Sequence, residues 1–202
     1  MGVDGTTEIY GIMGKPVSHS LSPAMHNAAF QELGLNRIYL PFEVDDVARA
    51  MDGFRAIGVR GVSVTIPHKQ AVIPHLDSID PVAEKIGAVN TLLIQDMHIR
   101  GYNTDWIGAN LTLEMLVELP ASTVLVIGAG GSARAIGFGL QEKGATVILA
   151  NRTLAKGQAL ARDLNCECYP LADVKDLKVD ALVNATSVGM TPKIDATPVP
   201  EP

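Results

Sequence analysis

Lys69 ends the segment SVTIPHK, in which an apolar, strand-like run leads into a proline, a histidine and the lysine. A lysine just past a strand is commonly a solvated surface charge. Beside a carbonyl group that is being reduced, the same ammonium stabilises negative charge on oxygen and donates a proton to it. The choice between a surface role and acid–base chemistry depends on the residues that accompany it.

Further polar side chains that can bind a ligand stand where apolar runs begin or end. Ser20 and Ser22 precede a helix expected to begin at Pro23, so Ser22 is an N-cap candidate on structural grounds. Capping leaves Ser20 unexplained, and two hydroxyls at a helix start suit a carboxylate or a polyol. Similar residues at strand ends are Thr65, Asn90, Asn103 and Asp105. Structural interpretations exist as well: Asp105 or Thr104 could cap the helix that follows, and Asn90 could satisfy backbone groups in a turn.

The segment VLVIGAGGSARA contains a G-x-G-x-x-A pattern formed by Gly128, Gly130 and Ala133. An apolar strand leads into the pattern and a helix leads out of it, which is the context of a dinucleotide-binding loop. The first glycine permits a tight turn, the second lets a pyrophosphate approach the backbone, and the alanine allows close helix–strand packing. The helix start then offers free N–H groups to the phosphates.

The end of the next strand indicates which dinucleotide is bound. A site for NAD usually carries Asp or Glu there, which accepts hydrogen bonds from the ribose 2′-hydroxyl. This chain has Asn151, Arg152, Thr153 and Lys156 instead, and the two cations could flank the 2′-phosphate of NADP(H). The alternative is that Arg152 and Lys156 are ordinary exposed residues at a helix start. A later strand end is expected to cover the nicotinamide with Thr186, Ser187, Val188, Gly189 and Met190.

Short apolar runs alternate with helix-length segments along the chain, which predicts an α/β protein with right-handed crossovers and mostly parallel sheets. The expected strands are 9–13, 39–44, 61–65, 88–94, 123–127, 146–150 and 181–184. The expected helices are 23–33, 46–57, 82–86, 106–118, 132–143 and 154–164. Because the pattern restarts after Pro120, we expect a substrate-binding catalytic domain over 1–105, a linker helix over 106–118 and a Rossmann-like NADP-binding domain over 119–202.

The composition weighs against several classes of function. A net charge of −6 is unfavourable for nucleic-acid binding, and no apolar run is long enough to cross a membrane. The N-terminal residues lack the features of a signal peptide. Cys166 and Cys168 have no histidine or cysteine cluster near them, which predicts free thiols and no metal site. We expect a cytoplasmic protein with no metal, membrane or nucleic-acid partner.

Taken together, the motifs resemble those of the shikimate dehydrogenase family in order and approximate spacing. Seven carry the resemblance over almost the whole chain: SHSLSP, SVTIPHK, GAVNTL, GYNTDW, GAGGSARA, NRT and NATSVGM. The resemblance implies reversible, NADPH-dependent reduction of 3-dehydroshikimate to shikimate on the route to chorismate and the aromatic amino acids. The expected partners are NADP(H) and this small-molecule substrate, and the expected assembly is a monomer or a homodimer.

The resemblance also implies roles for individual residues. Lys69 and Asp105 match the catalytic pair of the family. Ser20 and Ser22 match the serines that hold the substrate carboxylate. The residues that match those holding the ring hydroxyls are Thr65, Lys69, Asn90 and Asp105. The residues that match the cofactor site are Gly128, Ala129, Gly130, Gly131, Ser132, Ala133, Asn151, Arg152, Thr153, Lys156, Thr186, Ser187, Val188 and Met190.

Two features depart from the family pattern. The sequence ends at TPVPEP, whereas family members continue and complete the nucleotide-domain sheet, and Trp106 stands where glycine is usual. We therefore expect this chain to be either a portion of a longer or bifunctional protein or a shortened form. In either case, a sheet edge and an apolar surface that the missing segment covers in the family would be exposed. The other interpretations are a quinate/shikimate dehydrogenase and a non-catalytic metabolite-binding relative. The serine pair and the NADP-type pocket favour shikimate, and Lys69 with Asp105 favours an enzyme.

Overall fold

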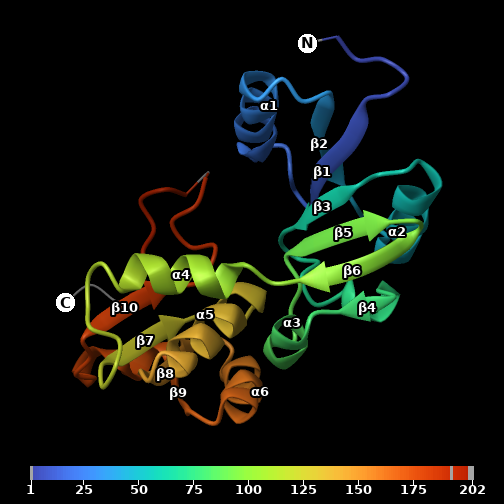
Figure 1. Cartoon of the computed structure of the whole chain (residues 1–202). Coiled ribbons are helices and arrows are strands. Elements are labelled where there is room, and N and C mark those ends of the chain that lie inside the picture. The colour runs from blue at the N-terminus through green and yellow to red at the C-terminus, as the bar shows by residue number, and fades with distance from the viewer. Residues whose placement is uncertain (1, 192, 200–202) are drawn as a thin grey trace. The chain divides into compact units, whose positions relative to one another are not determined.

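The computed structural model describes residues 2–191 and 193–199. The chain forms two compact units, one ending at Asn103 and the other beginning at Thr104. Both units contain helices and strands in alternation, as expected of an α/β protein (Figure 1). The boundary between the units lies two residues before the expected domain end at 105.

The first unit is built on a six-stranded sheet with the order β2-β1-β3-β5-β6-β4. Its strands are β1 (Glu8–Gly14), β2 (Arg37–Glu43), β3 (Gly61–Val64), β4 (Ser78–Ile79), β5 (Thr91–Gln95) and β6 (His98–Tyr102). Its helices are α1 (Ser22–Glu32), α2 (Val47–Ala56), α3 (Pro81–Ile86) and the 3₁₀ turn η1 (Ile73–His75). Strands β2, β1 and β3 are parallel, and so are β4 and β6, but β5 is antiparallel to both β3 and β6. This sheet is therefore mixed, although most of its strand pairs are parallel.

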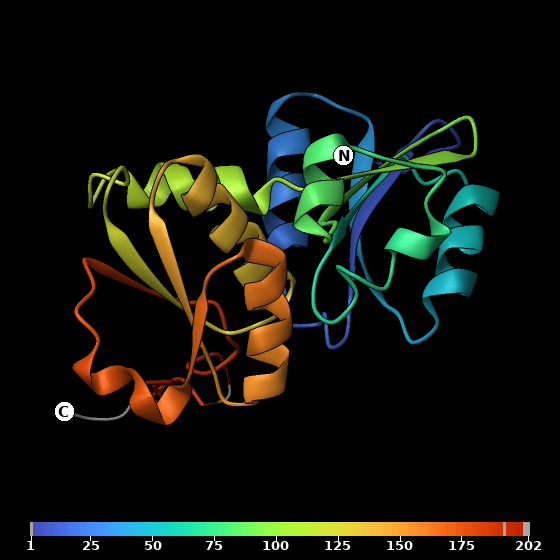
Figure 2. The ribbon, with the colours of Figure 1, turned by 90° about the horizontal axis from the view of Figure 1, so that it is seen from below.

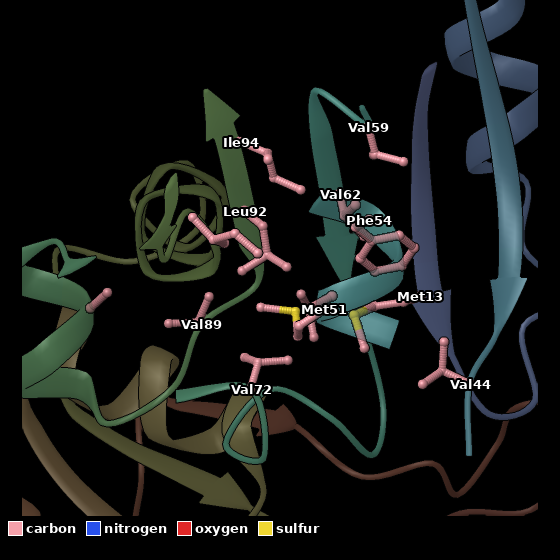
Figure 3. Close-up of a cluster of buried hydrophobic side chains, with 13 residues drawn as sticks. Met13, Val44, Met51, Phe54, Val59, Val62, Val72, Val89, Leu92 and Ile94 are labelled. Atoms are coloured by element: carbon pink, nitrogen blue, oxygen red, sulfur yellow. The ribbon is translucent and has the colours of Figure 1, made fainter. Parts of the chain in front are cut away.

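The core of the first unit lies between the sheet and α2. It consists of apolar side chains that include Met13, Met51, Phe54, Val62, Val64 and Leu92 (Figure 3). Because side chains alternate along a strand, Ser63 points to the opposite face of β3, and Thr65 follows two residues later. On that opposite face, Phe30 of α1 packs near Tyr10 and Tyr39.

The second unit has a four-stranded, wholly parallel sheet with the order β10-β7-β8-β9. Its strands are β7 (Thr123–Ile127), β8 (Thr146–Asn151), β9 (Glu167–Pro170) and β10 (Ala181–Asn184). Its helices are α4 (Asp105–Leu113), α5 (Gly131–Glu142), α6 (Leu154–Leu164) and the 3₁₀ segment η2 (Leu171–Asp176). Helices α5 and α6 cover one side of the strands and η2 covers the other (Figure 2). The Rossmann-like arrangement expected around the glycine loop is therefore present.

Some elements differ from the expected ones. Strands β4, β6 and β9 were not predicted, because they are short and carry few apolar residues; Ile99 is the only fully buried large side chain of β6. A tight turn with positive φ at Asp96 and Met97 joins β5 to β6. Strand β5 begins at Thr91 instead of residue 88. Helix α4 ends at Leu113 instead of 118, and turns follow it.

Candidate active site and cofactor pocket

A hollow of about 380 Å³ opens in the second unit where strands β7, β8 and β10 end. Parallel strands present their carboxyl ends on one edge, where ligands of open α/β sheets bind. The predicted cofactor residues that line the hollow are Gly128, Ala129, Gly130, Asn151, Arg152, Thr153, Lys156, Thr186, Ser187 and Val188. The glycine loop, the NRT segment and the NATSV segment thus come together at one place.

The two glycines of the loop serve different purposes. Gly128 has φ +123°, and a Cβ there would lie 3.0 Å from the carbonyl oxygen of Ala185. A side chain at this position would be strained by the backbone conformation and crowded by the Ala185 carbonyl. Gly130, at the start of α5, has no atom within 4 Å of where a Cβ would be. The backbone here is open to an approaching group, as the fit of a pyrophosphate requires.

The charge of the lining fits NADP(H). Arg152 and Lys156 are exposed at the end of β8 and the start of α6, and none of the lining residues in the described part of the chain is acidic. The Asn151 amide donates to the Thr153 carbonyl at 2.9 Å, which holds the turn that carries Arg152. The N-terminus of α5 adds N–H groups and a partial positive charge.

Five predicted cofactor residues do not line the hollow, and Gly189 is one of them. Gly131 and Ser132 begin α5, and Ala133 is completely buried between helix and sheet. The burial of Ala133 matches the expected close packing of helix on strand. Met190 is 46% exposed and lies beyond the NATSV segment.

Sequence reasoning did not find Asn184, which organises the segment after β10. Its Oδ1 accepts hydrogen bonds from the backbone N–H of Thr186 at 3.0 Å and from the Thr186 hydroxyl at 2.7 Å. Its amide donates to the Val188 carbonyl at 3.0 Å. An asparagine two residues before a threonine at a strand end is the sequence signal of such a turn. Lining residues that were also missed are Ile127, Leu171, Ala185 and Pro198.

In the first unit, four strand ends bring the predicted substrate residues to one edge of the sheet. Strands β1 and β3 are parallel and end there, β5 begins there, and β6 ends there. Backbone hydrogen bonds tie the ends together, from Thr65 N–H to Met13, from Val64 N–H to Asn90, and from Asn90 N–H to Tyr102. The segments that carry Ser20 and Ser22, Thr65 and Lys69, and Asn90 therefore leave the sheet at the same edge.

The loop that carries Lys69 is fixed from both sides. The Val89 N–H donates to the carbonyl of Lys69 at 2.7 Å. The neighbouring His68 is buried, and its Nε2 lies 2.9 Å from the carbonyl oxygen of Val44. Because that oxygen is only an acceptor, Nε2 must carry the proton. Lys69 itself is half-buried.

The serine pair differs from the expected capping geometry. Helix α1 begins at Ser22 rather than Pro23, and Leu21 is the N-cap residue, so the prediction of Ser22 as N-cap was wrong. The hydroxyl of Ser20 instead accepts the backbone N–H of Ser22 at 3.2 Å. Within the described part of the chain, the Ser22 hydroxyl makes no hydrogen bond, so it can donate to a ligand. The turn before α1 is therefore closed through the backbone N–H of Ser22, and the Ser22 side chain takes no part in it.

The residues of GYNTDW lie in different environments. Asn103 is buried, and its amide donates to the carbonyl of Ala88 at 2.9 Å, which supports the chain just before Asn90. Asp105 is half-buried in the first turn of α4, three residues after β6 ends. It is not the N-cap, because Thr104 holds that place without a side-chain capping bond. Trp106 packs edge-on against Phe138 of α5, with ring centroids 6.0 Å apart.

Cys166 and Cys168 are free thiols. Burial raises the pKa of Cys166 to about 11 and also raises the pKa of Cys168. In the described ranges, no group of three His, Cys, Asp or Glu residues is placed to hold a metal ion. The helices within those ranges are too short or too polar to cross a membrane.

Comparison with known proteins gives the family. A model of the shikimate dehydrogenase substrate-binding domain matches residues 12–92, and a model of shikimate/quinate 5-dehydrogenase matches residues 110–195. The chain belongs to the shikimate dehydrogenase family. The NADP(+) shikimate dehydrogenase of Methanothermobacter thermautotrophicus is 46% identical over 98% of this chain and 74% of its own length.

Solved structures of the shikimate dehydrogenase family have the same fold. The enzyme from Aquifex aeolicus matches with a TM-score of 0.89 at 41% identity, over 99% of this chain and 74% of its own. The Thermus thermophilus enzyme, solved with NADP(H) and shikimate, matches with a TM-score of 0.85 at 38% identity, over 96% and 74% of the two chains. This chain thus spans about three quarters of these relatives.

Proposed function

We propose that the protein catalyses the reversible, NADPH-dependent reduction of 3-dehydroshikimate to shikimate. The observation that carries this proposal is the meeting of four strand ends at one edge of the first sheet. The polar residues that match the family's substrate site leave the sheet at that edge. The similarity of the whole chain to NADP(+) shikimate dehydrogenases supports the same activity.

In this proposal, the first unit recognises the substrate. The hydroxyls of Ser20 and Ser22 hold the substrate carboxylate, since Ser22 has a hydroxyl that can donate. Thr65 and Asn90 hold ring hydroxyls, because both leave the sheet beside the Lys69 loop. A cyclic polyhydroxy acid offers one carboxylate and several hydroxyls, which suits this set of donors and acceptors.

Lys69 is the proposed proton donor. NADPH, when bound, supplies the hydride that adds to the ketone carbon. The carbonyl oxygen gains negative charge as this bond forms, and the Lys69 ammonium stabilises the charge and transfers a proton to it. The neutral amine then recovers its proton from solvent. Asp105 is proposed to orient the lysine and to accept a hydrogen bond from the substrate hydroxyl.

The second unit is proposed to hold NADP(H). The open backbone at Gly130 and the start of α5 would receive the pyrophosphate. Arg152 and Lys156 would pair with the 2′-phosphate, as their place in the lining and the absence of acidic lining residues in the described chain support. The segment organised by Asn184, with Thr186, would cover the nicotinamide end.

The test is the rate of NADP⁺ reduction with shikimate, for the parent and for Lys69→Ala. We expect the alanine variant to lose about 10²- to 10⁴-fold in kcat, the usual contribution of acid–base catalysis. Lys85→Ala, which removes an exposed lysine of α3 in the same unit, is the matched control and should keep the parental rate. Equal rates for the parent and Lys69→Ala would exclude the catalytic role. Binding without turnover in the parent would favour the non-catalytic metabolite-binding interpretation.

Quinate is the second candidate substrate, because the model that matches residues 110–195 describes shikimate/quinate dehydrogenases. Quinate and NAD⁺ are therefore run in the same assay, and a kcat/KM for quinate above that for shikimate would reverse the assignment.

We also propose that the protein acts in the cytoplasm, without nucleic acid, as a monomer or a homodimer. Its net charge of −6 and its free cysteines are consistent with this, and light scattering would measure the assembly.

A further inference from the structure

Helix α1 packs on the sheet without burying any of its residues fully. It also has no side-chain N-cap bond. The residues on its sheet-facing side, which are half-buried, are Ser22, Pro23, His26, Asn27 and Phe30. A helix with so little buried apolar surface needs specific contacts to fix its position.

Asn27 makes two of these contacts with a single residue of β2. Its amide donates to the carbonyl of Tyr39 at 2.9 Å, and its Oδ1 accepts the backbone N–H of Tyr39 at 2.8 Å. Strand β2 is at the edge of the sheet and lies beside α1 (Figure 1). The Asn27 side chain therefore replaces the strand that would otherwise pair with the backbone of Tyr39.

Tyr39 connects this contact to β3. Its side chain is only 4% exposed, and its ring stacks on His26 at a centroid distance of 4.3 Å. Its hydroxyl donates to Ser63 Oγ at 2.7 Å, and Thr65 follows two residues later, just past the end of β3. A continuous series of contacts thus runs from α1 through Tyr39 to β3, the strand that leads into Thr65.

We infer that Asn27 is a positioning residue for substrate recognition, which rests on the proposed function. Ser22 begins the same helix five residues before Asn27, a distance of about 7.5 Å along the helix axis. Because a helix moves as a rigid element, the bidentate contact at Tyr39 sets where the Ser22 hydroxyl lies relative to Thr65. Asn27 acts on the carboxylate end of the substrate without touching it.

The test compares binding of shikimate, its methyl ester and NADP⁺ by calorimetry, for the full chain and its variants. We expect Asn27→Leu, which has the same size but no hydrogen bonds, to weaken shikimate binding about tenfold. The ester lacks the carboxylate charge, so its affinity should change much less, and the affinity for NADP⁺ should stay the same. Asn27→Asp keeps the bond from the Tyr39 N–H and should fall between the parent and Asn27→Leu.

Gln31→Leu is the control, because it removes an exposed amide from the same helix one turn later. It should bind all three ligands as the parent does. Adding Asn27→Leu to Ser22→Ala should cost no further shikimate affinity if Asn27 acts through Ser22. Parental shikimate affinity in Asn27→Leu, or equal losses for all three ligands in Asn27→Leu and Asn27→Asp, would overturn the inference. A parent that binds NADP⁺ but neither shikimate nor its ester would instead overturn the proposed function.

Discussion

At the scale of single residues, Arg152 is expected to decide between NADP⁺ and NAD⁺. It is exposed in the lining of the cofactor hollow, directly after the strand end where NAD-dependent sites carry a carboxylate. Arg152→Asp should raise the KM for NADP⁺ at least about tenfold, because a carboxylate repels the 2′-phosphate, and should lower the KM for NAD⁺. Steady-state kinetics with both cofactors measure the change.

Arg162→Asp is the control for Arg152→Asp. It makes the same change of charge on α6 but lies outside the lining of the hollow. Its cofactor preference should be that of the parent. If both variants lose NADP⁺ affinity equally, the preference for NADP⁺ over NAD⁺ arises from the overall electrostatic field of the second unit and not from a contact at Arg152.

The two cysteines are expected to be poorly reactive. Burial raises the pKa of Cys166 from 9.0 to about 11, so the thiolate fraction at pH 8 falls about hundredfold. Iodoacetamide should therefore modify Cys166 about a hundredfold more slowly in the folded protein than in urea, as followed by mass spectrometry.

The same pKa shift makes the free energy of unfolding depend on pH in the alkaline range. The pKa of Cys166 is higher in the folded than in the unfolded chain, so the neutral thiol contributes its full stabilisation below about pH 9. This stabilisation is lost as the pH rises toward 11. Cys166→Ser should reduce this loss, which urea titrations at pH 8 and pH 10 would show. Modification at the same rate in folded and unfolded chains would contradict both expectations.

At the scale of elements, the glycine loop allows a paired prediction. Gly128→Ala should destabilise the protein by about 1–3 kcal/mol, because φ +123° is strained for a side chain and the Cβ would press on the Ala185 carbonyl. Gly130→Ala should leave stability nearly unchanged, since its Cβ would meet no atom, but should weaken NADP⁺ binding by filling the approach to the backbone. Thermal unfolding and calorimetry separate the two effects, and equal losses of stability would contradict this account.

The elements also show how far the sequence leads. The strand–loop–helix unit from β7 to α5 was predicted because its apolar run, glycines and helix start agree with one another. Strand β6 was missed because its pairing with β5, rather than its own apolar pattern, makes it a strand. Ser22 was wrongly taken as the N-cap: serine is favoured at that position, but here the helix begins one residue earlier and Leu21 occupies it.

The contacts of Asn27 and Asn184 were beyond sequence reasoning for a different reason. Both side chains bind backbone groups whose position depends on how a helix or loop meets a strand. Local sequence predicts that asparagine can make such bonds, but not which carbonyl or N–H it reaches. Candidate ligand-binding residues could therefore be proposed from the sequence, whereas the residues that hold their segments in place required the fold.

At the scale of the whole molecule, an apolar stripe on α4 and the turn after it should govern solubility. Ile107, Leu111 and Met115 recur every four residues, and Leu111 and Met115 are 60% and 84% exposed. Contiguous exposed apolar surface favours self-association. Leu111→Glu combined with Met115→Lys should lower light scattering at high protein concentration and shift the free energy of unfolding by no more than about 0.5 kcal/mol. The control is Ile57→Glu, which changes an exposed residue at the end of α2 and should alter light scattering little. An equal decrease in scattering in this control would mean that added charge alone causes the effect.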